Sequence, residues 1–146
     1  MLIQILIGAS VIFKTIVIQV LIISAAIHGL KKYGPWLGRP PYFVKTTLAL
    51  VAVVLWLVLG FTLSAWAWAG VFLMLDVFQA LEPALYFSIV TFTTLGYGDI
   101  TLEPHFRILA SFAAVDGLII FGLSTAFLAE CTHRIRSHQD KSNIES

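Results

Sequence analysis

Three stretches of apolar residues, each long enough to cross a lipid bilayer, dominate this sequence. They run from Met1 to Leu30, from Phe43 to Ala69 and from Phe106 to Cys131. A hydrocarbon core of about 30 Å requires roughly 20 apolar residues in helical form. A chain inside that core satisfies its backbone hydrogen bonds only as a helix or a closed barrel. We therefore predict an all-α membrane protein with three transmembrane helices.

Composition and charge exclude several other classes of protein. Hydrophobic residues make up 59% of the 146 residues and charged residues only 12%, whereas a soluble domain has about 25% charged residues. The net charge is +1, without a basic run or an acidic block, so we predict no nucleic-acid partner. No combination of nucleophile, base and metal ligands stands out. We therefore expect neither an enzyme nor a bound cofactor.

The loops between the apolar stretches predict the orientation of the chain. The connector over 31–42 is basic and contains no acid, and the tail over 132–146 adds Arg134, Arg136 and Lys141. The other side carries acids against one base: Asp76, Glu82, Asp99 and Glu103 against Arg107. Positive charge in short loops marks the cytoplasmic side. We predict a multi-pass protein of the plasma membrane with its N-terminus outside, its C-terminus in the cytoplasm, and Trp66 and Trp68 at the outer interface.

The connector over 70–105 is too apolar for an ordinary surface loop, yet its charges prevent it from being a full span. Pro83 at a first helical position, with Glu82 near the positive end of the helix dipole, favours a short helix over 83–93. Gly96 and Gly98 then allow backbone conformations that a helix does not use. Such backbone is tolerated within a membrane only where it is buried in protein or lines a cavity. We predict a re-entrant loop with a functional role.

Residues 93–99, Thr-Thr-Leu-Gly-Tyr-Gly-Asp, resemble the signature of potassium channels and follow a short helix, as they do in that family. The resemblance covers 43–131 and implies passive conduction of K⁺ through a selectivity filter, in which backbone carbonyls replace the hydration shell of the ion. The carbonyls belong to Thr94, Leu95, Gly96 and Tyr97, with Gly98 completing the filter and the Thr94 hydroxyl forming the innermost ring. The filter requires four copies, and the chain contains one. We therefore predict a homotetramer whose partners are K⁺ and the lipid bilayer.

The resemblance also predicts how the chain is divided. An extra transmembrane helix over 1–30 and a basic loop over 31–42 precede a pore domain over 43–131, and a short tail over 132–146 follows it. The pore domain comprises an outer helix over 43–69, a pore helix over 83–93, the filter over 94–99 and an inner helix over 106–131.

Four residues are predicted by the resemblance to support the filter: Asp99, Tyr86, Phe87 and Thr93. Some bacterial channels have a glutamate that pairs with the filter aspartate, but this sequence has Val90 at that place. Asp99 therefore loses that partner, and Tyr86 is the alternative. Relatives often have tryptophan where this chain has Phe87, which offers no hydrogen-bond donor. We predict that the rim of the filter is held less tightly than in such relatives.

The third apolar stretch resembles the inner helix of the same channels, with Gly117 at the position of its hinge. Helical spacing places Leu118, Phe121, Thr125 and Ala129 on one stripe, which we predict lines the inner cavity and gate. A second interpretation is that Gly117, Gly122 and Ala126 are small residues that allow close contact between helices.

Two charged residues lie inside the predicted spans. Asp116 falls away from the cavity stripe, and we predict that it is buried in protein, either as a satisfied hydrogen-bonding group or as an acid that attracts ions or controls gating. Lys14 interrupts the first span and either pairs with an acid such as Asp116 or extends to the membrane surface.

Two other functions fit the same sequence. One is a weakly selective cation channel, because a filter depends on its surroundings as well as its residues. The other is a non-conducting or regulatory subunit of a potassium transport complex. Transporters built on this loop plan usually depart from the full Gly-Tyr-Gly triplet, which disfavours that interpretation.

Overall fold

A computed structural model describes the backbone of residues 2–37 and 40–144 and the side chains of residues 2–34 and 40–134. This part of the chain forms four helices and no strand: α1 (Leu2–Leu37), α2 (Tyr42–Met74), α3 (Leu81–Phe92) and α4 (Arg107–Ile144). Three of them contain segments that are long and apolar enough to cross a membrane, over Leu2–Gly34, Tyr42–Met74 and Arg107–Arg134. The predicted all-α membrane fold, with three spans and a short additional helix, is confirmed.

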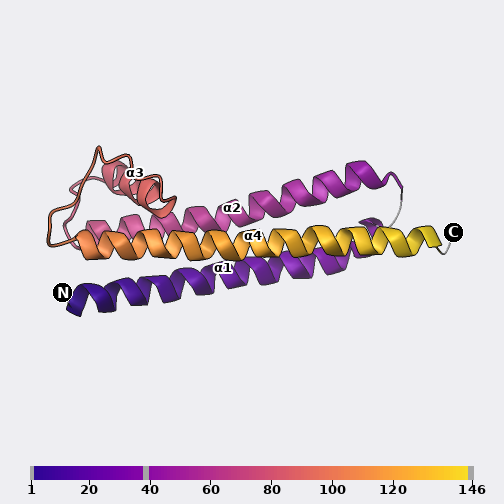
Figure 1. The fold of residues 1–146 in the computed structure, drawn as a ribbon, viewed down its shortest axis with the longest axis horizontal. Coiled ribbons are helices and arrows are strands. Elements are labelled where there is room, and N and C mark those ends of the chain that lie inside the picture. Colours follow the sequence, from indigo (N-terminus) through magenta and orange to yellow (C-terminus); the bar gives the residue numbers. More distant parts are fainter. Residues whose placement is uncertain (1, 38–39, 145–146) are drawn as a thin grey trace.

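The three long helices lie side by side, and the short helix α3 packs at one end of them (Figure 1). The N-terminal end of α1 lies at the same end as α3, whereas the C-terminal end of α1, the start of α2 and the end of α4 lie at the opposite end. The chain that follows α3 returns to the end from which α3 entered. The connector between α2 and α4 is therefore re-entrant.

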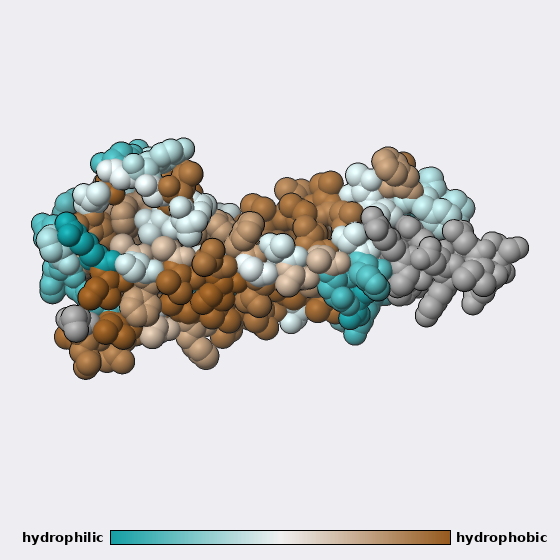
Figure 2. Space-filling view, in the orientation of Figure 1, coloured by the Kyte–Doolittle hydropathy of each residue, from teal (hydrophilic) through white to brown (hydrophobic). Residues whose placement is uncertain are grey.

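The outer surface of the long helices is apolar. Figure 2 shows hydrophobic residues along the middle of the molecule and hydrophilic residues near the α3 end. Large side chains such as Leu6, Phe13 and Leu55 are 63%, 69% and 65% exposed. Exposure of such an apolar surface to water would cost free energy, whereas its contact with lipid chains does not.

The helices differ from their predicted lengths. Helix α1 continues to Leu37 instead of ending at Leu30, because Lys31 and Lys32 are good helix formers and charge alone does not stop a helix. Helix α4 likewise continues past Cys131 to Ile144, through the predicted tail. Hydropathy marks where the bilayer ends, whereas helical hydrogen bonding extends beyond it.

The other two predicted helices have different ends for local reasons. Helix α2 extends past Ala69 to Met74, since the residues up to Asp76 are apolar and contain no strong helix breaker. Helix α3 begins at Leu81, with Ala80 as its N-cap, so Pro83 occupies the third helical position rather than the first. Proline is tolerated there because the first N–H groups of a helix have no partner within it.

Helix α3 is held against α2 and α4 by aromatic side chains. Trp68, Phe72 and Phe92 are fully or almost fully buried, at 0%, 0% and 1% exposed. The ring centroids of Phe61 on α2 and Phe92 on α3 lie 4.6 Å apart in an edge-to-face arrangement. These contacts fix the short helix at a defined angle to the long ones.

Candidate functional site

The loop after α3 begins directly at the carbonyl end of that helix. The Val90 carbonyl accepts hydrogen bonds from the N–H groups of Leu95 at 3.0 Å and Gly96 at 3.2 Å. The Thr94 N–H donates to the carbonyl of Thr91 at 2.9 Å. The last carbonyls of a helix otherwise lack partners, so these bonds anchor the loop to the helix end.

The backbone of the loop uses conformations that favour glycine. Gly96 and Gly98 have φ angles of 53° and 78°, in the region that side chains disfavour. Thr94 also has a positive φ, of 58°, although it is β-branched. Such a conformation costs about 1–3 kcal/mol and is typically found at functional sites. The loop therefore has the turned backbone that the sequence predicted for 96 and 98.

The side chain of Tyr86 reaches the rim of the loop. Its hydroxyl donates a hydrogen bond to Oδ2 of Asp99 at 2.6 Å. This bond lowers the pKa of Asp99 below its ordinary value of 3.8, because it stabilises the carboxylate, and it raises the pKa of Tyr86. The contribution of the carboxylate to stability is therefore present above pH 3.8 and is lost as the pH falls through the lowered pKa.

We predict that Tyr86→Phe raises the pKa of Asp99 towards its ordinary value. Without the hydroxyl, the carboxylate loses its donor and takes up a proton at a higher pH. The measurement is the titration of the Asp99 carboxyl carbon by NMR in the wild-type and variant chains. Tyr33→Phe, an exposed tyrosine on α1, is the control and should leave the titration unchanged. An unchanged Asp99 titration in Tyr86→Phe would contradict the assigned bond.

Phe87 and Val90 are both buried beside the loop. The Phe87 ring packs against Phe72 and Phe78, with centroids 5.3 and 5.4 Å away, and the Val90 side chain is only 8% exposed. Within one chain, Asp99 therefore receives a side-chain donor from Tyr86 and none from these two positions. Thr93 caps the helix end, because its hydroxyl donates to the carbonyl of Ile89 at 2.8 Å.

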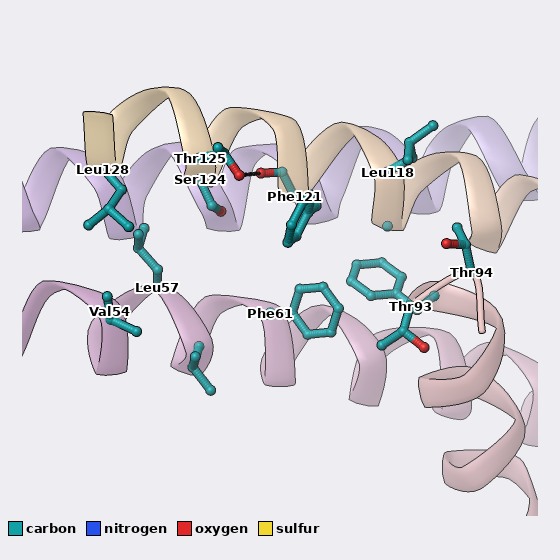
Figure 3. Close-up of a pocket in the computed structure, with 13 residues that line it drawn as sticks. Val54, Leu57, Phe61, Thr93, Thr94, Leu118, Phe121, Ser124, Thr125 and Leu128 are labelled. Carbon is teal, nitrogen blue, oxygen red and sulfur yellow. Dashed lines mark hydrogen bonds between the residues drawn. The ribbon is translucent and has the colours of Figure 1, made fainter. Parts of the chain in front are cut away.

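A hollow of about 610 Å³ lies below the loop, between α2 and α4 (Figure 3). It brings together the loop residues Thr93 and Thr94 and three residues of the predicted cavity stripe, Leu118, Phe121 and Thr125, with Gly117, the predicted hinge, beside them. The lining ends at Leu128 and does not include Ala129, which is exposed further along α4. Figure 3 shows Phe61 and Phe121 facing each other across this hollow. Sequence reasoning missed the α2 wall, which includes Val54, Leu57 and Phe61.

Large side chains near the loop and the hollow remain exposed in the single chain. Leu95 and Tyr97 are 55% and 68% exposed, and Leu118 and Phe121 are 63% and 64% exposed. Within one chain, the protein therefore does not surround Leu95 and Tyr97.

Gly117 lies where α4 meets the end of α3. A Cβ atom added to Gly117 would overlap the backbone carbonyl of Phe92, whereas one added to Gly122 would meet nothing within 4 Å. The interpretation of Gly117 as a small residue that allows close contact is therefore confirmed, whereas Gly122 makes no such contact within one chain.

Asp116 is fully buried and does not line the hollow. Its Oδ2 atom accepts hydrogen bonds from the Thr15 hydroxyl and the Trp68 indole, both at 2.7 Å. Lys14, by contrast, is exposed and does not pair with Asp116.

Trp68 was predicted to lie at the membrane interface, which is wrong, because it is 0% exposed. The sequence feature that indicates this burial is Asp116 itself, because a carboxylate inside a membrane span needs hydrogen-bond donors from the protein.

The comparison with known families agrees with this geometry. Residues 51–134 match the family described as ion channel. The matched segment contains most of α2, all of α3, the loop and the membrane-spanning part of α4. No curated protein and no solved structure matches the chain. Since the match covers more than half of the sequence, this membrane-spanning chain belongs to the ion channel family.

Proposed function

We propose that four copies of this chain form a potassium-selective channel, whose filter consists of the backbone carbonyls of residues 94–97 with Gly98. The observation that carries this proposal is the positive φ of Gly96 and Gly98 directly after the carbonyl end of a short re-entrant helix. Alternating backbone of this kind turns successive carbonyls in one direction. A ring of carbonyls replaces the hydration shell of K⁺.

The exposed side chains of the loop support a tetramer. One loop cannot surround an ion, and Leu95 and Tyr97 need covering because they are 55% and 68% exposed. A neighbouring copy related by a closed fourfold axis would cover these side chains and supply the remaining carbonyls. Leu118 and Phe121, on the open side of α4, would then line a cavity shared by the four chains.

The ion path in this proposal runs from the filter into that cavity. The carbonyl end of α3 carries a partial negative charge and favours a cation below the filter. Thr94, at the inner end of the filter, lines the hollow together with Thr125. Ala129 lies further from the filter along α4 and belongs to the inner gate. Basic residues at the opposite end from α3 support the orientation that we propose, with the loop outside the plasma membrane and the tail in the cytoplasm.

The absence of a donor at Phe87 favours a second candidate, a weakly selective cation channel. Since Phe87 packs onto α2, the described side chains give Asp99 at the rim one hydrogen bond, from Tyr86. Bi-ionic reversal potentials of the purified, reconstituted chain distinguish the two candidates. A reversal potential that shifts strongly when Na⁺ replaces K⁺ supports the potassium channel, whereas an unchanged one supports the weakly selective channel.

Oligomeric mass gives an independent test of the assembly. We expect the purified chain in mild detergent to have the protein mass of four 16.1 kDa subunits, measured by light scattering. A monomer in conditions that retain the helical fold would contradict the proposed pore.

A further inference from the structure

Helix α1 lies entirely outside the family match, yet three of its polar side chains, Gln4, Thr15 and Gln19, are buried and bond to α4 or to the residues just before it. Gln4 donates to the backbone carbonyl of His105, and Gln19 donates to the Ser124 hydroxyl at 2.8 Å. Gln4 is 6% exposed, and Thr15 and Gln19 are 0% exposed. Polar groups in a bilayer are costly unless they find partners, so this buried face requires α4 beside it. Helix α1 is therefore part of the same folded unit as the pore.

The central contact of this face is the Asp116 carboxyl. Its Oδ2 atom joins three helices, because Thr15 belongs to α1, Trp68 to α2 and Asp116 to α4. Its Oδ1 atom is buried without a protein partner. Because Asp116 is 0% exposed and lines no part of the hollow, it is shielded from the proposed ion path.

The Asp116 carboxyl lies one residue from the contact between α4 and the backbone that leads into the proposed filter. The next residue, Gly117, lies against the backbone of Phe92, and an added Cβ would approach the Phe92 Cα to 3.0 Å. Phe92 is the last residue of α3 and is separated from Thr94 by one residue. A shift of α4 at Asp116 would therefore reach the backbone at the start of the filter through a single contact.

We propose that Asp116 is a positioning residue for the selectivity filter and that α1 acts on the filter through it. Thr15 and Trp68 hold the carboxyl, the carboxyl fixes α4, and α4 supports the carbonyl end of the pore helix. The inference rests on the proposed function as a potassium channel. It assigns a role in conduction to α1, which two-span pores do not contain.

The test compares variants that remove one hydrogen-bonding group at a time from this cluster. Thr15→Val keeps the shape of the side chain but loses the donor, and Trp68→Phe loses the indole N–H. Asp116→Leu removes the acceptor, whereas Asp116→Asn retains a carbonyl oxygen that can accept both bonds. Thr62→Val is the matched control, since the exposed Thr62 hydroxyl bonds only to the carbonyl of Val58 in its own helix, at 2.8 Å.

The readout is block by Ba²⁺, a divalent ion close in size to K⁺, in the reconstituted full chain. We expect Thr15→Val, Trp68→Phe and Asp116→Leu to change the apparent dissociation constant of Ba²⁺ about threefold or more, the factor that corresponds to one interhelical hydrogen bond in a membrane. Asp116→Asn and Thr62→Val should retain the wild-type value. A merely structural role would reduce the amount of assembled channel without changing the block of those that conduct.

Three results would overturn the inference: wild-type block in Thr15→Val, wild-type block in Asp116→Leu, or altered block in Asp116→Asn. If Thr15→Val does not assemble, Trp68→Phe decides by the same measurement. Failure of the proposed function is distinguishable, because the wild-type chain itself would then show no potassium-selective, barium-sensitive flux.

Discussion

Replacing Gly96 by alanine is expected to abolish potassium-selective flux through the reconstituted chain. Gly96 has a φ of 53°, and a Cβ atom in that region costs about 1–2 kcal/mol. In a tetramer the cost recurs in every copy, so the backbone is expected to relax and turn its carbonyls out of the ring. Flux of K⁺ into liposomes, measured beside Na⁺ flux, is the assay.

The control for this prediction is Gly70→Ala. Gly70 lies in the interior of α2, and an added Cβ would meet nothing within 4 Å. Both variants add one methyl group, but only one adds it where φ is positive. Wild-type flux and selectivity in Gly96→Ala would show that this backbone is not the conducting ring.

Gly117→Ala is expected to destabilise the chain more than any other single methyl addition considered. The added Cβ would overlap the carbonyl of Phe92, and a backbone atom cannot move aside as a flexible side chain can. Overpacking a core costs typically about 1–3 kcal/mol, and a clash with backbone lies at the upper end of that range. We expect a lower thermal unfolding temperature in detergent.

Gly122→Ala provides the comparison on the same helix. Its Cβ would enter open space within the chain, and alanine has a helix propensity about 1 kcal/mol better than glycine. We therefore expect unchanged or slightly raised thermal stability for this variant. Equal stability of Gly117→Ala and Gly122→Ala would contradict the close contact between α4 and the end of α3.

The sequence predicted the membrane spans well and their ends less well. Apolar runs locate the bilayer-crossing segments because lipid selects for apolar surface over a fixed length. The helix ends at Leu37 and Ile144 lie outside the apolar runs. In these segments charged residues form helix in water as readily as apolar residues do. Hydropathy therefore cannot locate these ends.

Local motifs could be recognised in the sequence, whereas contacts between distant segments could not. The turned backbone at Gly96 and Gly98 follows from the residues themselves, since glycine tolerates it. One partner of Asp116 is Thr15, which is 101 positions away, and nothing in either local sequence pairs them. The burial of Trp68 could not be predicted for the same reason, because its indole N–H donates a hydrogen bond to the distant, buried Asp116 carboxylate.

The exposure of the loop residues could not be predicted for a related reason. The side chains of Leu95 and Tyr97 can be covered by their own chain or by a neighbouring copy, and the sequence of the loop does not distinguish the two. In the single chain neither is covered. The missing contacts belong, in our proposal, to neighbouring copies.

The most direct test of the proposed channel is ion flux through the purified chain in liposomes that contain no other protein. We expect K⁺ flux that Ba²⁺ blocks and that falls sharply when Na⁺ replaces K⁺. Equal, barium-insensitive fluxes of K⁺ and Na⁺ through an assembled tetramer would contradict the potassium-selective filter assigned to residues 94–98.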